Sequence, residues 1–208
     1  MSEGPSQLNH GERPIGPGRF ILVVGPSGAG KDTLIRLAQA ASEGNANIVF
    51  PQRIVTRDAS LSENNSPMSP GQFFAARARG DFAVQWEAHG LHYGLPRSII
   101  DEIRAGRTVV ANVSRTIIES VRHVFANVTV ILVTAPPDVL AGRVAVRARA
   151  SDGPLAARLR RDIPSAAPDH IINNTGGVEE HASELLHAIE DRGARAESKP
   201  TPSNERSS

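Results

Sequence analysis

A lysine that follows a cluster of glycines has the clearest chemistry in this sequence. Lys31 closes the stretch Gly25-Pro26-Ser27-Gly28-Ala29-Gly30-Lys31, and the apolar run Phe20–Val24 precedes it. Glycines let the backbone turn sharply and approach an anion, and the start of a helix adds partial positive charge. Lysine adds a compact charge that can bridge outer phosphates. This stretch, which continues into Asp32 and Thr33, is therefore predicted to bind the phosphates of a nucleotide.

A second group of cationic side chains lies in the C-terminal half. Arg143 and Arg147 are four residues apart and would share one face of a helix, and Arg158 follows beyond a Gly-Pro break. Planar guanidinium groups match the geometry and charge of phosphate oxygens. These arginines therefore either bind phosphate or form a basic helix pair on the surface.

Composition narrows the class of protein. The chain has 208 residues, enough for one α/β domain with its own core, and a formal net charge of +1, which gives no field that would attract nucleic acid. It has no cysteine, which excludes disulfides and thiolate metal sites. No apolar run approaches the length of a membrane span, and the first residues lack the apolar core of a signal peptide. We therefore expect a cytoplasmic protein with small-molecule substrates, without nucleic-acid or membrane partners.

Apolar runs alternate with helical patterns, which predicts the α/β class, with a largely parallel sheet and helices on its faces. Strands are expected at 20–24, 108–113, 128–133 and 169–172, and short strands or a hairpin within 82–94. Helices are expected at 31–42, from 69 onward with Phe73 and Phe74 on the buried side, and at 96–105, 137–149, 155–162 and 178–192.

The remaining segments are predicted to lie outside regular structure. Residues 56–68 are polar and show no apolar period, which indicates a loop. Residues 1–18 and 193–208 are rich in Gly, Pro, Ser and charged residues, so they are predicted to be disordered tails. The folded unit is expected to be one domain, residues 19–192.

Several motifs occur together in a fixed order. The glycine-rich loop is followed by the pair Thr56-Arg57, the stretch His89-Gly90-Leu91-His92-Tyr93-Gly94 and the arginine-rich segment 143–161. In this order the chain resembles the guanylate kinase family of P-loop NTPases over about residues 19–190, and within it is most similar to the ribose 1,5-bisphosphate phosphokinases. The resemblance implies a parallel sheet flanked by helices, a lid, and a small subdomain that binds the phosphate acceptor.

The resemblance also implies an acceptor site. The family's Thr-Thr-Arg segment, whose arginine grips the acceptor phosphate, corresponds to Val55-Thr56-Arg57, and its Tyr-Gly-Thr segment to Tyr93-Gly94-Leu95. Arg57 and Tyr93 are thus implied phosphate ligands. The acidic residue that reads guanine corresponds to Val84, and Leu95 has no hydroxyl for a purine. Apolar residues at both positions favour an acceptor that has phosphate but no guanine.

Two more segments resemble the ribose 1,5-bisphosphate phosphokinases in particular. Glu63 lies in one of them, shortly after Asp58, and either carboxylate is a candidate to orient the acceptor. Ligands of open α/β sheets lie beyond the carboxyl ends of the strands, which implicates the residues that end the strand 108–113: Asn112, Ser114 and Arg115. Arg115 would supply the extra cation that a second acceptor phosphate needs. The alternative for Arg115 is a surface arginine at the start of a helix.

On the donor side, the resemblance implies a lid over ATP. Arg143, Arg147 and Arg158 match the lid arginines, which stabilise charge on the transferred phosphoryl group and act as catalytic residues together with Lys31. Asn173 matches the position that contacts adenine in the family. The alternative for Asn173 is a turn-forming asparagine.

Magnesium is the expected metal. A loop of this kind usually ends in Gly-Lys-Ser or Gly-Lys-Thr, whose hydroxyl binds Mg²⁺, whereas Asp32 follows Lys31 here. The aspartate that guanylate kinases carry at the end of the middle strand is Ser114 in this chain. We therefore hypothesise that Asp32 holds Mg²⁺ directly or through water. The alternative is that Asp32 only caps the helix start, where negative charge is favourable.

These observations lead to one hypothesis and two alternatives. The hypothesis is an ATP-dependent kinase that converts ribose 1,5-bisphosphate to 5-phospho-α-D-ribose 1-diphosphate, and the resemblance implies a role in phosphonate breakdown. The alternatives are a guanylate or other nucleoside monophosphate kinase, and a catalytically silent guanylate-kinase-like interaction module. The sequence leaves the oligomeric state open, a homodimer included.

Overall fold

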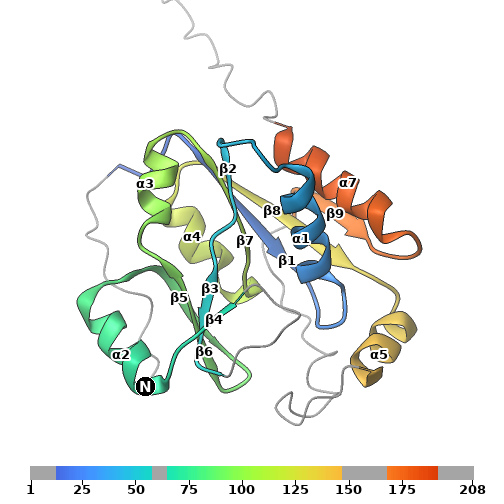
Figure 1. The fold of residues 1–208 in the computed structure, drawn as a ribbon, viewed down its shortest axis with the longest axis horizontal. Helices are drawn as coiled ribbons and strands as arrows, with labels where there is room; N and C mark the ends of the chain where they lie inside the picture. Colours follow the sequence, from blue (N-terminus) through green and yellow to red (C-terminus); the bar gives the residue numbers. More distant parts are fainter. Residues whose placement is uncertain (1–12, 58–64, 147–167, 192–208) are drawn as a thin grey trace, which may run out of the picture.

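The computed structural model describes residues 13–57, 65–146 and 168–191, and their strands form two sheets (Figure 1). The main sheet has five strands in the order β2-β7-β1-β8-β9, and every pair in it is parallel, which confirms the expected α/β class. Its strands are β1 (Arg19–Val24), β2 (Ile48–Val49), β7 (Thr108–Asn112), β8 (Val128–Thr134) and β9 (His170–Asn173). The small sheet has the order β4-β3-β6-β5, with β3 (Arg53–Val55), β4 (Asn65–Pro67), β5 (Phe82–Ala88) and β6 (Leu91–Pro96).

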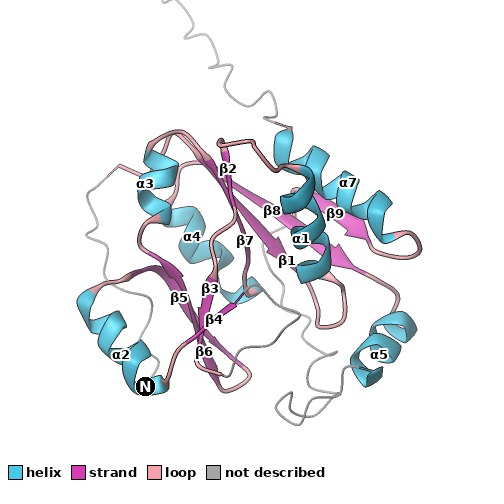
Figure 2. Cartoon of the chain, in the orientation of Figure 1, coloured by secondary structure: helices cyan, strands magenta, loops and turns pink. Residues whose placement is uncertain are grey.

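Helices connect the strands and cover them (Figure 2). They are α1 (Lys31–Ala41), α2 (Pro70–Arg79), α3 (Ile99–Arg104), the short 3₁₀-helix η1 (Arg115–Ile117), α4 (Ile118–Val124), α5 (Pro137–Val146) and α7 (Val178–Glu190). In the part of the chain that the structure describes, no helix is long and apolar enough to cross a membrane.

The side chains of β1 alternate between two apolar cores, as expected for a strand that is buried on both faces. Ile21 and Val23 pack in the core that α1 and α7 cover, with Leu34 and Leu185. Phe20, Leu22 and Val24 pack on the opposite face, in a core that also includes residues of α3, α4 and the small sheet. The small sheet is therefore anchored to the main sheet through a shared apolar core.

The small sheet is covered on its outer face by α2. Phe73 of α2 is buried and stacks on Phe82 of β5, with the ring centroids 4.6 Å apart. A Cβ at Gly94 would lie 2.7 Å from the Phe82 ring, so a larger residue at this position would displace the phenylalanine. The ring of His92 also stacks on Phe73. These contacts fix the β5–β6 hairpin from outside, while its inner face meets the main sheet.

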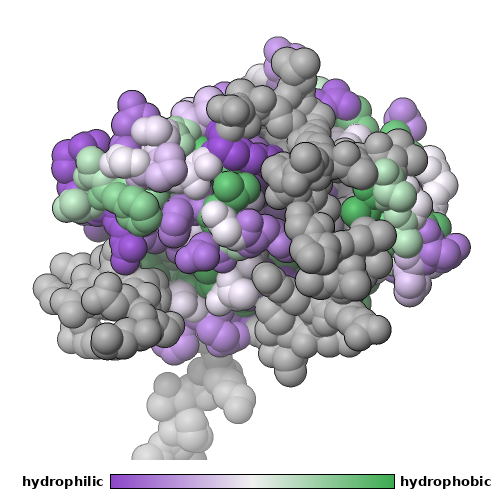
Figure 3. Space-filling view, turned by 90° about the horizontal axis from the view of Figure 1, so that it is seen from below, coloured by the Kyte–Doolittle hydropathy of each residue, from purple (hydrophilic) through white to green (hydrophobic). Residues whose placement is uncertain are grey.

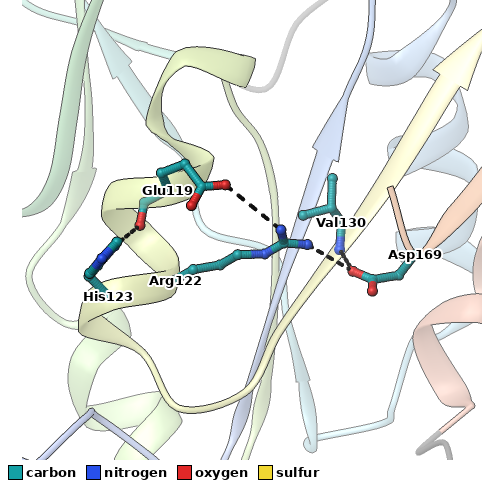
Figure 4. Close-up of polar contacts among 5 residues, drawn as sticks. All are labelled: Glu119, Arg122, His123, Val130 and Asp169. Atoms are coloured by element: carbon teal, nitrogen blue, oxygen red, sulfur yellow. Dashed lines mark hydrogen bonds and ion pairs between the residues drawn. The ribbon is translucent and has the colours of Figure 1, made fainter. Parts of the chain in front are cut away.

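A polar network ties β8, β9 and α4 together at the amino-terminal ends of the strands (Figure 4). Asp169 Oδ2 accepts a hydrogen bond of 2.8 Å from the Val130 backbone N–H and lies 3.4 Å from Arg122 Nη2. Arg122 Nη1 also lies 3.9 Å from Glu119 Oε1 on the same helix. Because these residues lie at the ends of the strands opposite the glycine-rich loop, their role is structural.

The structure differs from the sequence-based expectations in several places, and β2, β3 and α4 were not expected at all. Ile15, expected in a disordered tail, forms a bridge with Phe125 and packs against the core, so the ordered chain begins before residue 19. Phe74, expected on the buried side of its helix, is 44% exposed. The helix expected from Pro96 begins at Ile99, because Pro96 still belongs to β6. The expected loop 56–68 contains β4, which pairs with β3. The expected helix 155–162 and the end of the helix 137–149 lie outside the described residues.

Candidate nucleotide and acceptor site

The glycine-rich loop joins the carboxyl end of β1 to the start of α1 (Figure 1). Gly25 has a φ of +147°, and a Cβ there would lie 2.0 Å from the Val133 carbonyl oxygen. Gly30 has a φ of +85° and is the N-cap residue of α1. Only glycine fits so close to β8 at position 25, and the positive φ at both positions also favours glycine. The loop therefore has the tight turn and the helix start that phosphate binding requires.

The side chain of Lys31 folds back over this loop. Its Nζ donates hydrogen bonds to the carbonyl oxygens of Gly25, at 2.8 Å, and Pro26, at 3.0 Å. These bonds hold the ammonium group beside the loop amides. The positive charge is thus in place for phosphates bound in the loop.

Asp32 is connected to the neighbouring strand β7. Its Oδ1 accepts a hydrogen bond of 2.7 Å from Asn112 Nδ2, where β7 ends. The helix N-cap is Gly30, and no side chain caps it. Asp32 lies in the first turn, where its charge is favourable, but its oxygen pairs with β7 instead of closing the helix end. The geometry therefore favours an oriented carboxylate next to the loop over a simple cap.

Helix α5 brings Arg143 next to the loop. A Cβ added at Gly28 would lie 2.9 Å from the Leu140 carbonyl oxygen and 3.6 Å from Arg143 Cβ. The Nη1 atom of Arg143 is shielded from solvent and has no hydrogen-bond partner among the described residues. The side chain of Arg143 thus starts beside the glycine-rich loop, and a guanidinium nitrogen in this state can donate to an oxyanion. Its expected partners in the lid, Arg147 and Arg158, lie outside the described residues.

The expected acceptor residues come from the small sheet and from the end of β7. Tyr93 of β6 is buried and stacks on Trp86, with the ring centroids 5.4 Å apart. Arg57 lies two residues after the end of β3. Thr56, between them, accepts a hydrogen bond of 2.9 Å from the His92 N–H through its hydroxyl. Beyond β7, Ser114 Oγ accepts hydrogen bonds from Thr116 and caps η1, which begins at Arg115. Glu63 and Asp58 lie outside the described residues.

The two positions that would read a purine face each other across the hairpin. Val84 of β5 pairs with Leu95 of β6; Leu95 is fully buried, and Val84 packs against the same core. Neither side chain can form a hydrogen bond. The hairpin therefore has apolar side chains at the two positions that correspond to the family's guanine-binding residues.

Donor and acceptor elements face the same side of the molecule. Strands β1, β7 and β8 are parallel, and their carboxyl ends point toward the lower side of Figure 1. Figure 3 shows the molecule from that side, and many of the residues that are not grey there are hydrophilic. This is the side at which ligands of open α/β sheets bind.

Comparison with known proteins identifies the family. The chain is 52% identical over 197 residues, 94% of its length, to a ribose 1,5-bisphosphate phosphokinase from Bradyrhizobium diazoefficiens, whose whole length is covered. It is 55% identical over 175 residues, 84% of this chain and 90% of the relative, to the protein of the same name from Rhodopseudomonas palustris. This chain belongs to the ribose 1,5-bisphosphate phosphokinase family. No protein-family model matches it.

The solved structures place this member of the family on the guanylate kinase fold. A guanylate kinase from Anaplasma phagocytophilum superposes with a TM-score of 0.58 over 83% of this chain and 84% of its own, at 19% identity. At this identity the likeness concerns the fold alone. The expected guanylate-kinase-like α/β fold is confirmed.

Two residues of this phosphokinase-family chain that contact the candidate site were not predicted from the sequence. Asn174 is only 4% exposed, and its Nδ2 donates a hydrogen bond of 2.8 Å to the Ala29 carbonyl oxygen in the loop. Its neighbour Asn173, the expected adenine contact, is exposed at the end of β9. An asparagine pair after a strand that ends beside the loop was the available signal, but only the fold shows which of the two turns inward.

The second missed residue is Arg53 of β3. Its guanidinium carbon lies 5.2 Å from the centroid of the Tyr93 ring, and its Nη1 lies 3.4 Å from the Asn112 carbonyl oxygen. The signal in the sequence was an arginine at the start of a short apolar run, four positions before Arg57.

The candidate magnesium ligand Asp32 can be compared with the usual coordination of magnesium. Among the described residues there is no group of three or more His, Asp or Glu side chains that could hold an ion. Mg²⁺ in kinases commonly takes one or two carboxylates and completes its coordination with substrate phosphates and water. A single oriented carboxylate, Asp32, beside the phosphate loop fits this mode.

Proposed function

We propose that this protein transfers the γ-phosphoryl group of ATP to ribose 1,5-bisphosphate, giving 5-phospho-α-D-ribose 1-diphosphate and ADP. The observation that carries this proposal is 52% identity to a ribose 1,5-bisphosphate phosphokinase over 94% of this chain and all of that relative. The phosphate loop and the apolar Val84–Leu95 pair agree with it, because they supply a donor site and disfavour a purine acceptor.

The reaction requires positioning and charge stabilisation more than a strong base. An oxygen of the acceptor 1-phosphate forms a bond to the γ-phosphorus. The bond between that phosphorus and the β,γ-bridging oxygen breaks, and this oxygen leaves with ADP and keeps the electron pair. The attacking oxygen is already ionised near neutral pH, so no side chain has to remove a proton from it. The transition state spreads charge over the equatorial oxygens of the transferred group, and cations next to that group lower the barrier.

The side chains have separate parts in this reaction. The loop amides and Lys31 hold the ATP phosphates, and Arg143, with Arg147 and Arg158, stabilises the transferred phosphoryl group. Asn173 contacts the adenine.

The acceptor is held from the other side of the site. Arg57 and Tyr93 hold the reacting phosphate of the acceptor, and Asn112, Ser114, Arg115 and Glu63 line the rest of its site. These assignments follow the resemblance, and the common side on which the described residues lie supports them.

Magnesium completes the donor site. Asp32 would hold the ion, oriented by its hydrogen bond from Asn112. When bound, Mg²⁺ neutralises charge on the β- and γ-phosphates. Because both substrates are metabolites of the cell interior, we infer a cytoplasmic location.

A parallel assay of acceptors tests the proposal. ADP release is coupled to an optical signal with ribose 1,5-bisphosphate and GMP as alternative acceptors, and the diphosphate product is identified by phosphorus NMR. The Lys31→Met variant is the control for contaminating kinases. The proposal predicts turnover with the sugar bisphosphate and little with GMP. A preference for GMP would make the protein a nucleoside monophosphate kinase, and no turnover with either would favour the silent module.

A further inference from the structure

The position of Arg53 in the small sheet determines which residues share its face. Ile54 pairs with Gly94, and Val55 pairs with Tyr93. Side chains alternate along a strand, so Arg53 and Val55 are on the face that also carries Tyr93 and Leu95. The distance of 5.2 Å between the Arg53 guanidinium carbon and the Tyr93 ring agrees with this placement. Arg53 therefore lies on the inner face of the small sheet, beside the expected acceptor residues.

The guanidinium of Arg53 is held in a defined orientation. Its Nε donates a hydrogen bond of 3.0 Å to Asn65 Oδ1 on β4, and its Nη1 donates one of 3.4 Å to the carbonyl oxygen of Asn112 on β7. The side chain is half-buried. An arginine whose fork is fixed by neighbouring strands loses less rotamer entropy when it binds an anion.

The partner of Arg53 on β7 leads directly to the donor loop. The side chain of Asn112 donates to Asp32 at the start of α1, while its carbonyl accepts from Arg53. Arg53 is thus two hydrogen bonds from the loop, on the side of the small sheet. Arg53 and Asp32 thus contact Asn112 from opposite sides, Arg53 from the small sheet and Asp32 from the start of α1.

The chemistry of this face favours an anion over a base. The same face carries Leu95 opposite Val84, and neither can satisfy the polar edge of a purine. A guanidinium matches a phosphate in shape and charge. We propose that Arg53 binds the 5-phosphate of the sugar acceptor, and so selects a doubly phosphorylated sugar in the place where a nucleobase would otherwise lie. This inference rests on the proposed function, since it adds Arg53 to Arg115, the cation already expected at the second acceptor phosphate.

The competing role for Arg53 is purely structural, because it also links β3 to β4 and β7. The two roles predict different measurements. A structural link affects unfolding temperature and all ligands together. A phosphate ligand affects only ligands that carry the 5-phosphate.

Direct binding of ribose 5-phosphate separates the two roles without catalysis. Calorimetry compares the wild-type protein with Arg53→Gln, Arg53→Lys and the control Arg104→Gln, an exposed arginine on α3 that is 4.0 Å from Asp101. We expect Arg53→Gln to weaken binding of this probe about 10- to 100-fold, as loss of charge-assisted hydrogen bonds does, and Arg53→Lys to weaken it less. The control should bind like the wild type, and unfolding temperatures show which variants remain folded.

Kinetics with two acceptors completes the test. For Arg53→Gln the KM of ribose 1,5-bisphosphate should rise by a similar factor, while the KM of ATP stays within about twofold. With ribose 1-phosphate, which lacks the 5-phosphate, wild type and variant should be equally poor. Unchanged binding of ribose 5-phosphate in Arg53→Gln would overturn the inference, and so would a parallel loss of ATP and sugar-phosphate affinity. If the wild type makes no diphosphate, the proposed function fails, but the binding measurement still decides the role of Arg53.

Discussion

Replacement of Asn174 by alanine should weaken nucleotide binding through the loop it holds. Asn174 is buried, its backbone N–H donates to the Thr134 carbonyl oxygen at 2.8 Å, and its side chain donates to the Ala29 carbonyl at 2.8 Å. A Cβ added at Gly30 would lie 2.4 Å from Asn174 Nδ2, so the amide fills the space next to the N-cap of α1. The residue therefore fixes the part of the loop whose amides would surround a phosphate.

The size of the effect follows from one buried hydrogen bond. Removal of the donor leaves the Ala29 carbonyl unsatisfied in a buried place, which costs about 1–3 kcal/mol. If the loop relaxes to another conformation, part of the free energy of ATP binding is used to restore the binding conformation, and the observed affinity falls. Because about 1.4 kcal/mol corresponds to a factor of ten, the Kd of ATP should rise about 5- to 100-fold.

Calorimetry with ATP and thermal unfolding should be measured on the same preparations. Asn174→Asp keeps the shape but places an acceptor against the Ala29 carbonyl, so it should weaken ATP binding at least as much as alanine does. Thr175→Ala, at an exposed neighbour, is the matched control and should bind ATP like the wild type. If Asn174→Ala lowers the unfolding temperature but leaves ATP affinity unchanged, the residue only packs, and this reasoning is wrong.

Three further results are expected. Gly30→Ala should reduce ATP binding and stability together, because its Cβ would meet the Asn174 amide and its φ is +85°, and circular dichroism would show whether the fold survives. Asp32→Ser should raise the Mg²⁺ concentration needed for half-maximal activity, and an unchanged Mg²⁺ titration would remove Asp32 from the metal site. The hydrogen bond to the Thr175 carbonyl and, after it, the nearby Glu184 raise the pKa of His181 above 6.5, although partial burial opposes them. Protonated His181 therefore adds stability that is complete below pH 6.5 and is lost as the pH rises through the higher folded-state pKa. In His181→Gln the unfolding temperature should therefore fall less than in the wild type as the pH rises from 6.5 through that pKa.

The sequence was sufficient to predict the strand, glycine-rich turn and helix of the candidate nucleotide site, because their constraints are local. Gly25 and Gly30 are needed at backbone conformations that other residues rarely adopt, and an apolar strand and a helical pattern flank them in the sequence itself. The alternation of strands and helices predicted the parallel sheet for the same reason. Such features need no knowledge of distant contacts.

The residues that the sequence analysis missed depend on distant contacts. Arg53 becomes relevant through the register of β3 with β6 and through the end of β7, 59 residues later in the chain. Asn174 contacts Ala29 across a separation of 145 residues. Phe74 was expected to be buried because it is apolar and adjacent to Phe73, but α2 packs only one face on the hairpin. Register and helix orientation, which no local pattern specifies, decided all three.

Asn112 links the candidate donor site to the small sheet that we propose to hold the acceptor. Its side chain donates to Asp32 at the start of α1, and its carbonyl accepts from Arg53 on the small sheet. Its backbone lies in β7, which pairs with β1 immediately before the glycine-rich loop. A phosphoryl group moves only a short distance between its donor and acceptor, so small errors in their separation are costly to the rate. A residue fixed in the central sheet, with hydrogen bonds to both sides, therefore limits that separation better than any contact between the two mobile substrates.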